Sequence, residues 1–251
     1  MSGTGPADGL PLLARQALAE FLGSAGLVAV VIGSGIAAQR LSPADVGLQL
    51  LENALATGAG LVALILAFGP VSGGHFNPVV TLADRFFGGV SSRQVAVYLP
   101  AQLAGGAVGA VVANLMFDLP AVSVATTDRS GGGLWLSEAV ATFGLVVLIF
   151  ALVRAGRAAL APFAVGAYIT AAYWWSSSTS FANPMIDVAR TLSDTFAGIA
   201  PASVPMFVLV QLVGGAAAVV VVTLLYPQVG AVADAVVVPH DTDHPAPQES
   251  S

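Results

Sequence analysis

The 251-residue sequence contains no cysteine and no lysine, and only 9% of its residues are charged. Without cysteine, disulfides, thiolate catalysis and thiolate metal sites are all excluded. Eight arginines against fourteen acidic residues leave a net charge of −6, and the basic patch expected of a nucleic-acid binder is missing. Soluble domains carry about 25% charged residues. These charged residues are too few to cover the surface of a soluble protein of this size. The composition therefore predicts a surface that faces lipid.

Six hydrophobic stretches approach the length of about 20 residues that crosses a bilayer core of about 30 Å. They run over residues 12–36, 50–69, 95–117, 134–153, 161–175 and 204–226. The N-terminus lacks a basic region followed by a small-residue cleavage site, so the first stretch is expected to be retained as a membrane span. One transmembrane domain is therefore predicted over residues 11–227. The polar tails, residues 1–10 and 228–251, are expected to be disordered.

The arginines predict the orientation of the chain. An intracellular N-terminus places five of them on the cytoplasmic side and three outside, in the direction of the positive-inside rule. The five are Arg15, Arg85, Arg93, Arg154 and Arg157, and the three are Arg40, Arg129 and Arg190. Six spans return the C-terminus to the same side. We expect a multi-pass protein of the plasma membrane with both termini in the cytoplasm.

The chain repeats itself over residues 11–117 and 134–226. Glu20 and Ser24 correspond to Glu138 and Thr142, and AQLAGGAVGAVVANLMF at 101–117 corresponds to VQLVGGAAAVVVVTLLY at 210–226. FNPVVTLADR at 76–85 corresponds to ANPMIDVART at 182–191. All three correspondences come in the same order. Because each repeat has three spans, an odd number, the second repeat must be inserted upside down relative to the first.

Each repeat carries an Asn-Pro pair after its second span. Asn suits the N-cap of a helix and Pro suits its first position, so Asn77-Pro78 and Asn183-Pro184 each predict a helix that begins at the Asn. About ten helical residues follow, and they extend only about 15 Å, half of the bilayer core. Asn-Pro is also a common turn dipeptide, but matched flanks in both repeats favour two half-helices. Inverted copies would bring both Asn-Pro ends together near the midplane.

These residues resemble the aquaporin (major intrinsic protein) family. SGGHFNPVVTLA at 72–83 is very close to the first signature of that family, and the resemblance covers residues 12–227. It implies an all-α membrane fold with six transmembrane helices, two re-entrant half-helices and two inverted repeats. It also implies a bacterial aquaglyceroporin-like or metalloid-channel-like member that assembles as a homotetramer.

The resemblance implies which residues line the pore. Asn77 and Asn183 would donate side-chain N–H groups to passing water, with Pro78, Val79, Pro184 and Met185 completing the two motifs. The positive ends of the half-helices would face the centre of the channel and exclude cations and protons. An acceptor ladder would come from the carbonyl groups of Gly73, Gly74, His75, Ser180, Phe181 and Ala182.

Glu20 and Glu138 lie inside spans, where a carboxylate is costly and must face the bundle interior. In the family such glutamates brace the re-entrant loops, and the rival role is that of a proton-relay acid. His75 either fixes its loop through ring hydrogen bonds or makes permeability sensitive to pH. The string HDTDH at 240–244 has metal-ligating side chains, but a solvated tail is the favoured interpretation. No metal or cofactor is expected.

The constriction of the pore departs from the family pattern. Where familiar members have Asn-Pro-Ala followed by Arg, this chain has Ile186, and Arg190 follows one helical turn later. Arg190 lines the mouth or pairs with Asp187. Counting back from each Asn places Thr57 or Ala59, and Ala171 or Tyr173, at two further constriction positions. A small residue with Ile186 predicts a wider, less polar constriction, unless Tyr173 or Arg190 folds into the lumen.

We therefore predict a passive channel for water and small uncharged solutes, either polyols such as glycerol or metalloid hydroxides such as arsenous acid. A water-selective aquaporin is the alternative. A secondary transporter would need carboxylates for coupling ions, for which only Glu20 and Glu138 are available. A membrane enzyme lacks support, because no nucleophile–base pair or metal-ligand cluster occurs within the spans. A purely structural junction protein would show no swelling response.

Overall fold

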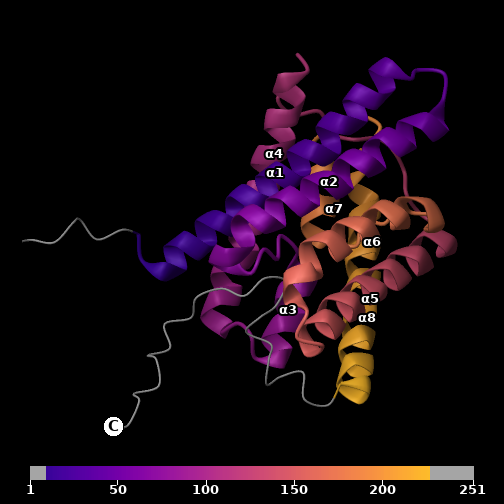
Figure 1. Ribbon diagram of the computed structural model, residues 1–251. Helices are drawn as coiled ribbons and strands as arrows, with labels where there is room; N and C mark the ends of the chain where they lie inside the picture. Colours follow the sequence, from indigo (N-terminus) through magenta and orange to yellow (C-terminus); the bar gives the residue numbers. More distant parts are fainter. Residues whose placement is uncertain (1–9, 227–251) are drawn as a thin grey trace, which may run out of the picture.

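The computed structural model describes residues 10–226, and within them all regular structure is helical. The predicted tails, residues 1–10 and 228–251, lie almost entirely outside these described residues. The elements are α1 (Leu12–Leu41), α2 (Val46–Ser72), α3 (Pro78–Phe87), α4 (Ser92–Met116), α5 (Gly132–Arg154), the 3₁₀ turn η1 (Ala158–Leu160), α6 (Ala161–Trp175), α7 (Pro184–Arg190), the 3₁₀ turn η2 (Pro201–Ser203) and α8 (Val204–Leu225). Figure 1 shows their arrangement.

Five helices are long and apolar enough to cross a membrane: α1, α2, α4, α5 and α8, the last with its preceding 3₁₀ turn. The fifth of the six predicted stretches is the shortest, because α6 has only 15 residues. At 1.5 Å per residue α6 extends about 23 Å. The turn η1 runs directly into it and lengthens the helical stretch to residues 158–175.

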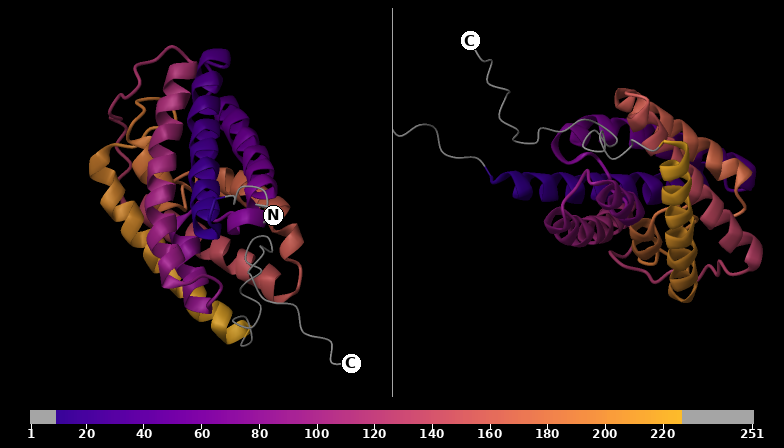
Figure 2. Two further views of the ribbon diagram at one scale, coloured as in Figure 1. Left: turned by 90° about the vertical axis from the view of Figure 1, so that its left-hand side faces the viewer. Right: turned by 90° about the horizontal axis from the view of Figure 1, so that it is seen from below.

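The two repeats form two groups of helices. In the first, α1 packs against α2 and α4; in the second, α5 packs against α8 and α6, and α2 meets α6 across the boundary. Figure 1 and the two views of Figure 2 show the first group, coloured indigo to magenta, crossing the second, coloured rose to yellow. The half-helices α3 and α7 each contact both α4 and α8, the third spans of the two repeats. Both half-helices are thus held by both repeats.

Glycine permits the closest helix contacts. A Cβ atom at Gly105 of α4 would lie 2.2 Å from the carbonyl oxygen of Phe21 in α1, and one at Gly214 of α8 would lie 2.2 Å from that of Ala139 in α5. Small residues at helix crossings are how membrane helices bring their backbones together. The paired glycines that mark the repeat in the sequence therefore set the spacing of both helix pairs.

The half-helices begin where the sequence predicts. Asn77 and Asn183 are their N-caps, and Pro78 and Pro184 take the first helical position, where the missing N–H has no helical partner to lose. The helix α3 has 10 residues and ends at Gly88, whose φ of 93° lies in the left-handed region that glycine favours. The helix α7 is shorter, with 7 residues. Both are too short to cross a bilayer.

Candidate functional site

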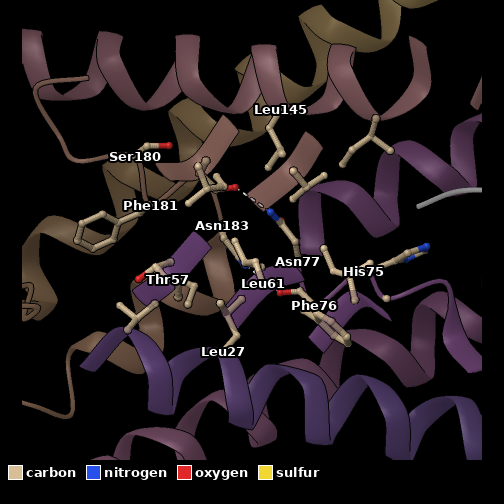
Figure 3. A pocket seen from close by; sticks show the side chains of 18 of the residues that line it. Leu27, Thr57, Leu61, His75, Phe76, Asn77, Leu145, Ser180, Phe181 and Asn183 are labelled. Carbon is tan, nitrogen blue, oxygen red and sulfur yellow. Dashed lines mark hydrogen bonds between the residues drawn. The ribbon is translucent and has the colours of Figure 1, made fainter. Parts of the chain in front are cut away.

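The two Asn-Pro ends meet in the centre of the molecule. The Nδ2 atom of Asn77 donates to the carbonyl oxygen of Ala182 at 2.8 Å, and Nδ2 of Asn183 donates to the carbonyl oxygen of Phe76 at 2.8 Å. Each asparagine is therefore bonded to the residue that precedes the other one. Figure 3 shows both side chains in one cavity, with a volume of 60 Å³.

Each asparagine also caps its own half-helix. Its Oδ1 atom accepts the backbone N–H of the residue two positions later, Val79 at 2.9 Å and Met185 at 3.0 Å. An amide group carries two N–H donors, and only one of them bonds across to the other repeat. The second N–H of each side chain is the group that can donate to a solute in the cavity.

Two buried glutamates hold the loops before the asparagines. Glu20 accepts the backbone N–H groups of His75 at 3.0 Å and Phe76 at 2.8 Å. Glu138 likewise accepts those of Phe181 at 2.9 Å and Ala182 at 2.8 Å. Both carboxylates are completely buried, so each is stabilised by charge-assisted hydrogen bonds rather than by water.

These bonds determine where the loop carbonyl groups point. In a planar trans peptide the C=O is opposite the N–H of the next residue. Because the N–H groups of His75 and Phe76 point at Glu20, the carbonyl groups of Gly74 and His75 point away from it. In the same way, the carbonyl groups of Ser180 and Phe181 point away from Glu138. These two residues line the cavity, as Gly74 and His75 do. Gly73, the first residue of the predicted ladder, is the C-cap of α2 and is not among the lining residues.

The loop backbone is strained in a matched way in both repeats. The residues one, three and four positions before each asparagine have positive φ: Phe76 (47°), Gly74 (66°) and Gly73 (90°), and Ala182 (46°), Ser180 (48°) and Thr179 (63°). For residues other than glycine this conformation costs about 1–3 kcal/mol each. Gly73 and Gly74 could have signalled the turn in the first repeat, but the second repeat carries no glycine there.

Two glutamines form bridges that were not predicted from the sequence. Gln102 Nε2 bonds both Glu20 Oε2 at 2.7 Å and Thr81 Oγ1 at 3.0 Å. At the equivalent place Gln211 Nε2 bonds Glu138 Oε2 at 2.7 Å and the carboxylate of Asp187 at 3.2 Å. Each glutamine therefore ties a loop-bracing glutamate to its half-helix. The repeated Gln-Leu-x-Gly-Gly pattern contained this signal, because a polar residue at matched positions inside two spans needs a buried partner.

The structure distinguishes between the alternative constriction residues. Thr57 and Tyr173 line the cavity, and their hydroxyl oxygens lie 3.1 Å apart. Ala59 and Ala171 are exposed on the outer surface and do not line it. Ile186 lines the cavity as well. Thr57 is the residue reached by counting back from Asn77 without a gap, whereas Tyr173 is the residue reached by counting back from Asn183 with a loop two residues shorter.

Arg190 lies in the lumen rather than in a salt bridge with Asp187. It is 3% exposed and lines the cavity, its Nε donates to the carbonyl oxygen of Ala197, and its Cζ lies 3.5 Å from the ring centroid of Phe181. Tyr173 lies in the lumen too. Both side chains thus narrow the constriction and make it more polar. Tyr173 and Arg190 in the lumen are the exception under which a wider, less polar constriction is not expected.

A second arginine approaches the same ring from outside the spans. The Cζ atom of Arg129, in the connection between α4 and α5, lies 5.1 Å from the Phe181 centroid, and its Nε donates to the carbonyl oxygen of Gly198 at 2.9 Å. Burial lowers the pKa of the Arg129 guanidinium from its ordinary value. Two guanidinium groups therefore face one aromatic ring at this end of the cavity.

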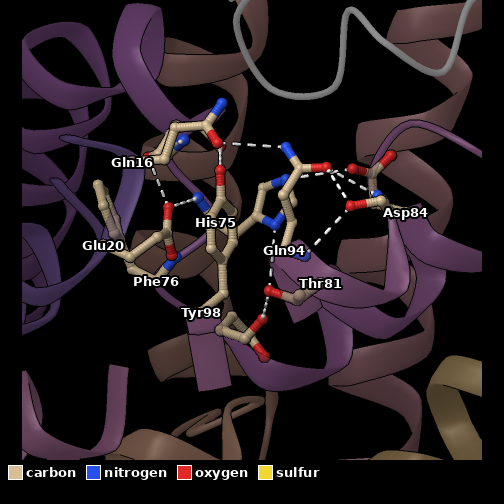
Figure 4. A network of polar contacts seen from close by, with 12 residues as sticks. Gln16, Glu20, His75, Phe76, Thr81, Asp84, Gln94 and Tyr98 are labelled. Carbon is tan, nitrogen blue, oxygen red and sulfur yellow. Dashed lines mark hydrogen bonds and ion pairs between the residues drawn. The ribbon is translucent and has the colours of Figure 1, made fainter. Parts of the chain in front are cut away.

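His75 is held at both ring nitrogens. Nδ1 lies 3.0 Å from Thr81 Oγ1, and Nε2 lies 3.4 Å from Asp84 Oδ2. The ring also packs edge-on against Tyr98, with centroids 5.6 Å apart. Figure 4 shows this network beside Glu20. The contacts support the loop-fixing role that was one of the two interpretations of His75.

Comparison with known proteins identifies the family. A sequence profile described as Major intrinsic protein matches residues 10–196. The chain belongs to the major intrinsic protein family. It is 49% identical over 206 residues to aquaglyceroporin AqpS of Rhizobium meliloti, covering 82% of this chain and 88% of that protein. It is 32% identical over 221 residues to the glycerol uptake facilitator protein of Pseudomonas aeruginosa, covering 76% and 78%.

A solved structure supports the fold. The X-ray structure of the aquaglyceroporin from Plasmodium falciparum matches with a TM-score of 0.66 at 18% identity, covering 87% of this chain and 99% of that one. At that identity the likeness shows the fold alone. The predicted all-α membrane fold of the major intrinsic protein family, with its two re-entrant half-helices, is therefore confirmed.

Proposed function

We propose that this member of the major intrinsic protein family is a passive channel for water and small uncharged solutes such as glycerol, and that solutes pass the cavity between Asn77 and Asn183. The observation that carries this proposal is the meeting of two half-helix N-termini, each with one unused amide N–H, beside carbonyl groups from both loops. Donors and acceptors along one narrow path can replace the hydrogen bonds that a solute makes in water.

Electrostatics supports the exclusion of ions. The N-terminus of an α-helix carries a partial positive charge of roughly half an elementary charge, and two such termini face the centre of the path. We propose that Arg190 adds a full positive charge at one end and takes the part that the arginine following the second motif plays in familiar members. Its Nε and its planar face are used by Ala197 and Phe181, which leaves its terminal amino groups for solutes.

The structure of the carboxylate sites argues against a coupled transporter. A coupling ion needs oxygen ligands that are free to bind it. Each oxygen of Glu20 and Glu138 already accepts a hydrogen bond from the protein. No site for a coupling ion is therefore proposed at either carboxylate.

Glycerol and metalloid hydroxides are the proposed solutes beside water. The two relatives named above as an aquaglyceroporin and a glycerol uptake facilitator support the first. The second is an extension to neutral trihydroxy solutes of similar size, such as arsenous acid. Ile186 makes part of the cavity wall aliphatic, which suits the apolar edge of a polyol. The plasma membrane, cytoplasmic termini and a homotetramer complete the proposal.

Stopped-flow light scattering from proteoliposomes tests the proposal with water, glycerol and arsenous acid side by side. We expect rapid water flux and faster equilibration of both larger solutes than in protein-free vesicles. Water flux with exclusion of both larger solutes would favour the water-selective alternative. Saturating uptake that depends on pH or sodium would indicate a transporter, and absence of any swelling response would indicate a structural protein.

The Arg190→Ala variant tests the charge barrier. Removing this cation should raise the passage of protons or small cations while water flux persists, as measured with a pH-sensitive dye enclosed in the vesicles. A matched control is Arg93→Ala, because Arg93 is exposed at the start of α4 and does not line the cavity. Equal proton leak in both variants and the parent would show that Arg190 has no part in ion exclusion.

A further inference from the structure

A second cavity lies between α3 and α8, on the outside of the helix bundle. It has a volume of 560 Å³ and is lined almost entirely by apolar side chains. On α3 the lining residues Val79, Leu82, Ala83 and Phe86 form one stripe at helical spacing. On α8 the lining runs from Leu212 to Leu224. We call this cavity the α3–α8 groove.

The groove extends from the middle of the membrane to one surface. It begins at Val79, two residues from the central Asn77, and ends where α3 ends. From Leu212 to Leu224 the axis of α8 rises about 18 Å, slightly more than half of a hydrocarbon core of about 30 Å. Its outer residues are open to the surroundings: Phe86 is 67% exposed, Val220 58% and Leu224 76%. The groove therefore matches the depth of a single lipid leaflet.

The other repeat shows how the equivalent crevice, between α7 and α4, is closed. At the central end the two crevices are filled alike, because an added Cβ at Gly106 would come within 2.5 Å of the Met185 sulfur and one at Gly215 within 2.4 Å of Val79 Cγ1. The connection that follows α4 covers the end of α7, because the N–H groups of Ser123 and Ala125 donate to the carbonyl oxygens of Leu192 and Thr191. In the described part of the chain, no segment covers the α3–α8 groove in this way.

We propose that the α3–α8 groove binds one acyl chain of a membrane phospholipid, which packs against the half-helix that carries Asn77. A second protein helix is about 10–12 Å wide, and 15 Å of such a cylinder occupies roughly 1,200 Å³ or more, which exceeds the volume of the groove. An extended peptide would bring unpaired backbone N–H and C=O groups into hydrocarbon, which is costly. An acyl chain is narrow, apolar and without groups to satisfy.

The surface end of the groove favours an anionic headgroup. Arg85 is exposed one residue before Phe86 in the sequence, near the end of α3, and its Nε donates to Ser92 Oγ at 3.0 Å, which leaves its terminal amino groups at the surface. Within residues 10–226 no carboxylate forms an ion pair with it. A guanidinium is suited to hold a phosphate group with two parallel hydrogen bonds. Phosphatidylglycerol is therefore expected to bind better than phosphatidylcholine.

Electron spin resonance of reconstituted full-length protein tests this proposal. The vesicles are phosphatidylcholine with a minor fraction of phosphatidylglycerol that is spin-labelled midway along one acyl chain. Ala216→Phe and Val220→Phe each place a ring in the groove, and Ala217→Phe places the same ring on the neighbouring exposed face of α8, outside it. We expect both groove variants to lose one immobilised lipid per protomer that the parent and Ala217→Phe retain. Unchanged thermal unfolding will show that the variants fold.

Headgroup selectivity gives a second readout. Arg85→Gln should reduce the preference for labelled phosphatidylglycerol over labelled phosphatidylcholine several-fold, without abolishing the immobilised component. Equal immobilised fractions in the parent and both groove variants would overturn the proposal, because the immobilised lipid would then lie outside the groove. A loss of assembly size in the groove variants, measured by native mass spectrometry, would overturn it in favour of a second copy of the chain.

Discussion

Replacing Glu138 by glutamine tests how much the buried carboxylate contributes to the site. The carboxylate receives three donors, the N–H groups of Phe181 and Ala182 and the amide of Gln211, at 2.7–2.9 Å. A glutamine offers one carbonyl oxygen, with two lone pairs, and an NH₂ group that is itself a donor. Glu138→Gln therefore satisfies at most two of the three donors, and its own NH₂ group would face the third.

The magnitude follows from these contacts. An unpaired buried donor costs about 1–3 kcal/mol, and changing two charge-assisted hydrogen bonds into neutral ones costs roughly 1 kcal/mol each. The expected loss of stability is about 3–5 kcal/mol. For a domain of this size that corresponds to a decrease of about 6–20 °C in the melting temperature. The loop carbonyl groups of Ser180 and Phe181 would lose their orientation at the same time, so water flux should decrease.

The assay is thermal unfolding in detergent, followed by stopped-flow swelling of proteoliposomes. Asp118→Asn is the matched control, because it removes one negative charge at an exposed position in the connection after α4. We expect this control to match the parent in both measurements. A melting temperature of Glu138→Gln within about 2 °C of the parent, with unchanged water flux, would refute the role of the carboxylate as the support of this loop.

Two further predictions concern packing and the constriction. Gly105→Ala should destabilise the protein by about 1–3 kcal/mol or more, because its Cβ would lie 2.2 Å from the carbonyl oxygen of Phe21. Gly133→Ala is the control, because its Cβ meets nothing within 4 Å. Equal melting temperatures of the two variants would contradict the packing argument. Ile186→Arg should reduce glycerol and arsenous acid flux more than water flux, because Ile186 lines the cavity; an equal loss for water would contradict that assignment.

The sequence was sufficient to predict the fold because the repeat is strongly patterned. Two Asn-Pro pairs with matched flanks predicted two helices that begin at Asn77 and Asn183, and both do. An Asn at the N-cap and a Pro at the first position are local rules that tertiary packing seldom overrides. Glycines at matched places in two spans likewise predicted close helix contacts, and Gly105 and Gly214 make them.

The constriction was harder to predict because it depends on loop length and side-chain reach. A difference of two residues in the length of a loop decides between Thr57 and Ala59, and between Tyr173 and Ala171. Arg190 reaches the lumen only because the ring of Phe181 and the carbonyl oxygen of Ala197 hold its long side chain there. Neither contact follows from spacing along the chain, since residue 197 lies in a segment without regular secondary structure.

The glutamine bridges were predicted only in part. Gln102 and Gln211 marked the repeat in the sequence, but their partners were not predicted. In the second repeat the partner is Asp187, where the first has Thr81. A change of residue type at equivalent positions hid the common function, which is to join a buried glutamate to a half-helix.

Because the chain contains no cysteine, single cysteines can locate the path of water directly. Thr57→Cys places a thiol in the lumen, and Ala59→Cys places one on the outer surface of the same helix. We predict that a mercurial reagent blocks osmotic water flux through Thr57→Cys proteoliposomes and leaves the parent and Ala59→Cys open. Block of Ala59→Cys, or continued flux through fully labelled Thr57→Cys, would contradict a path between the two asparagines.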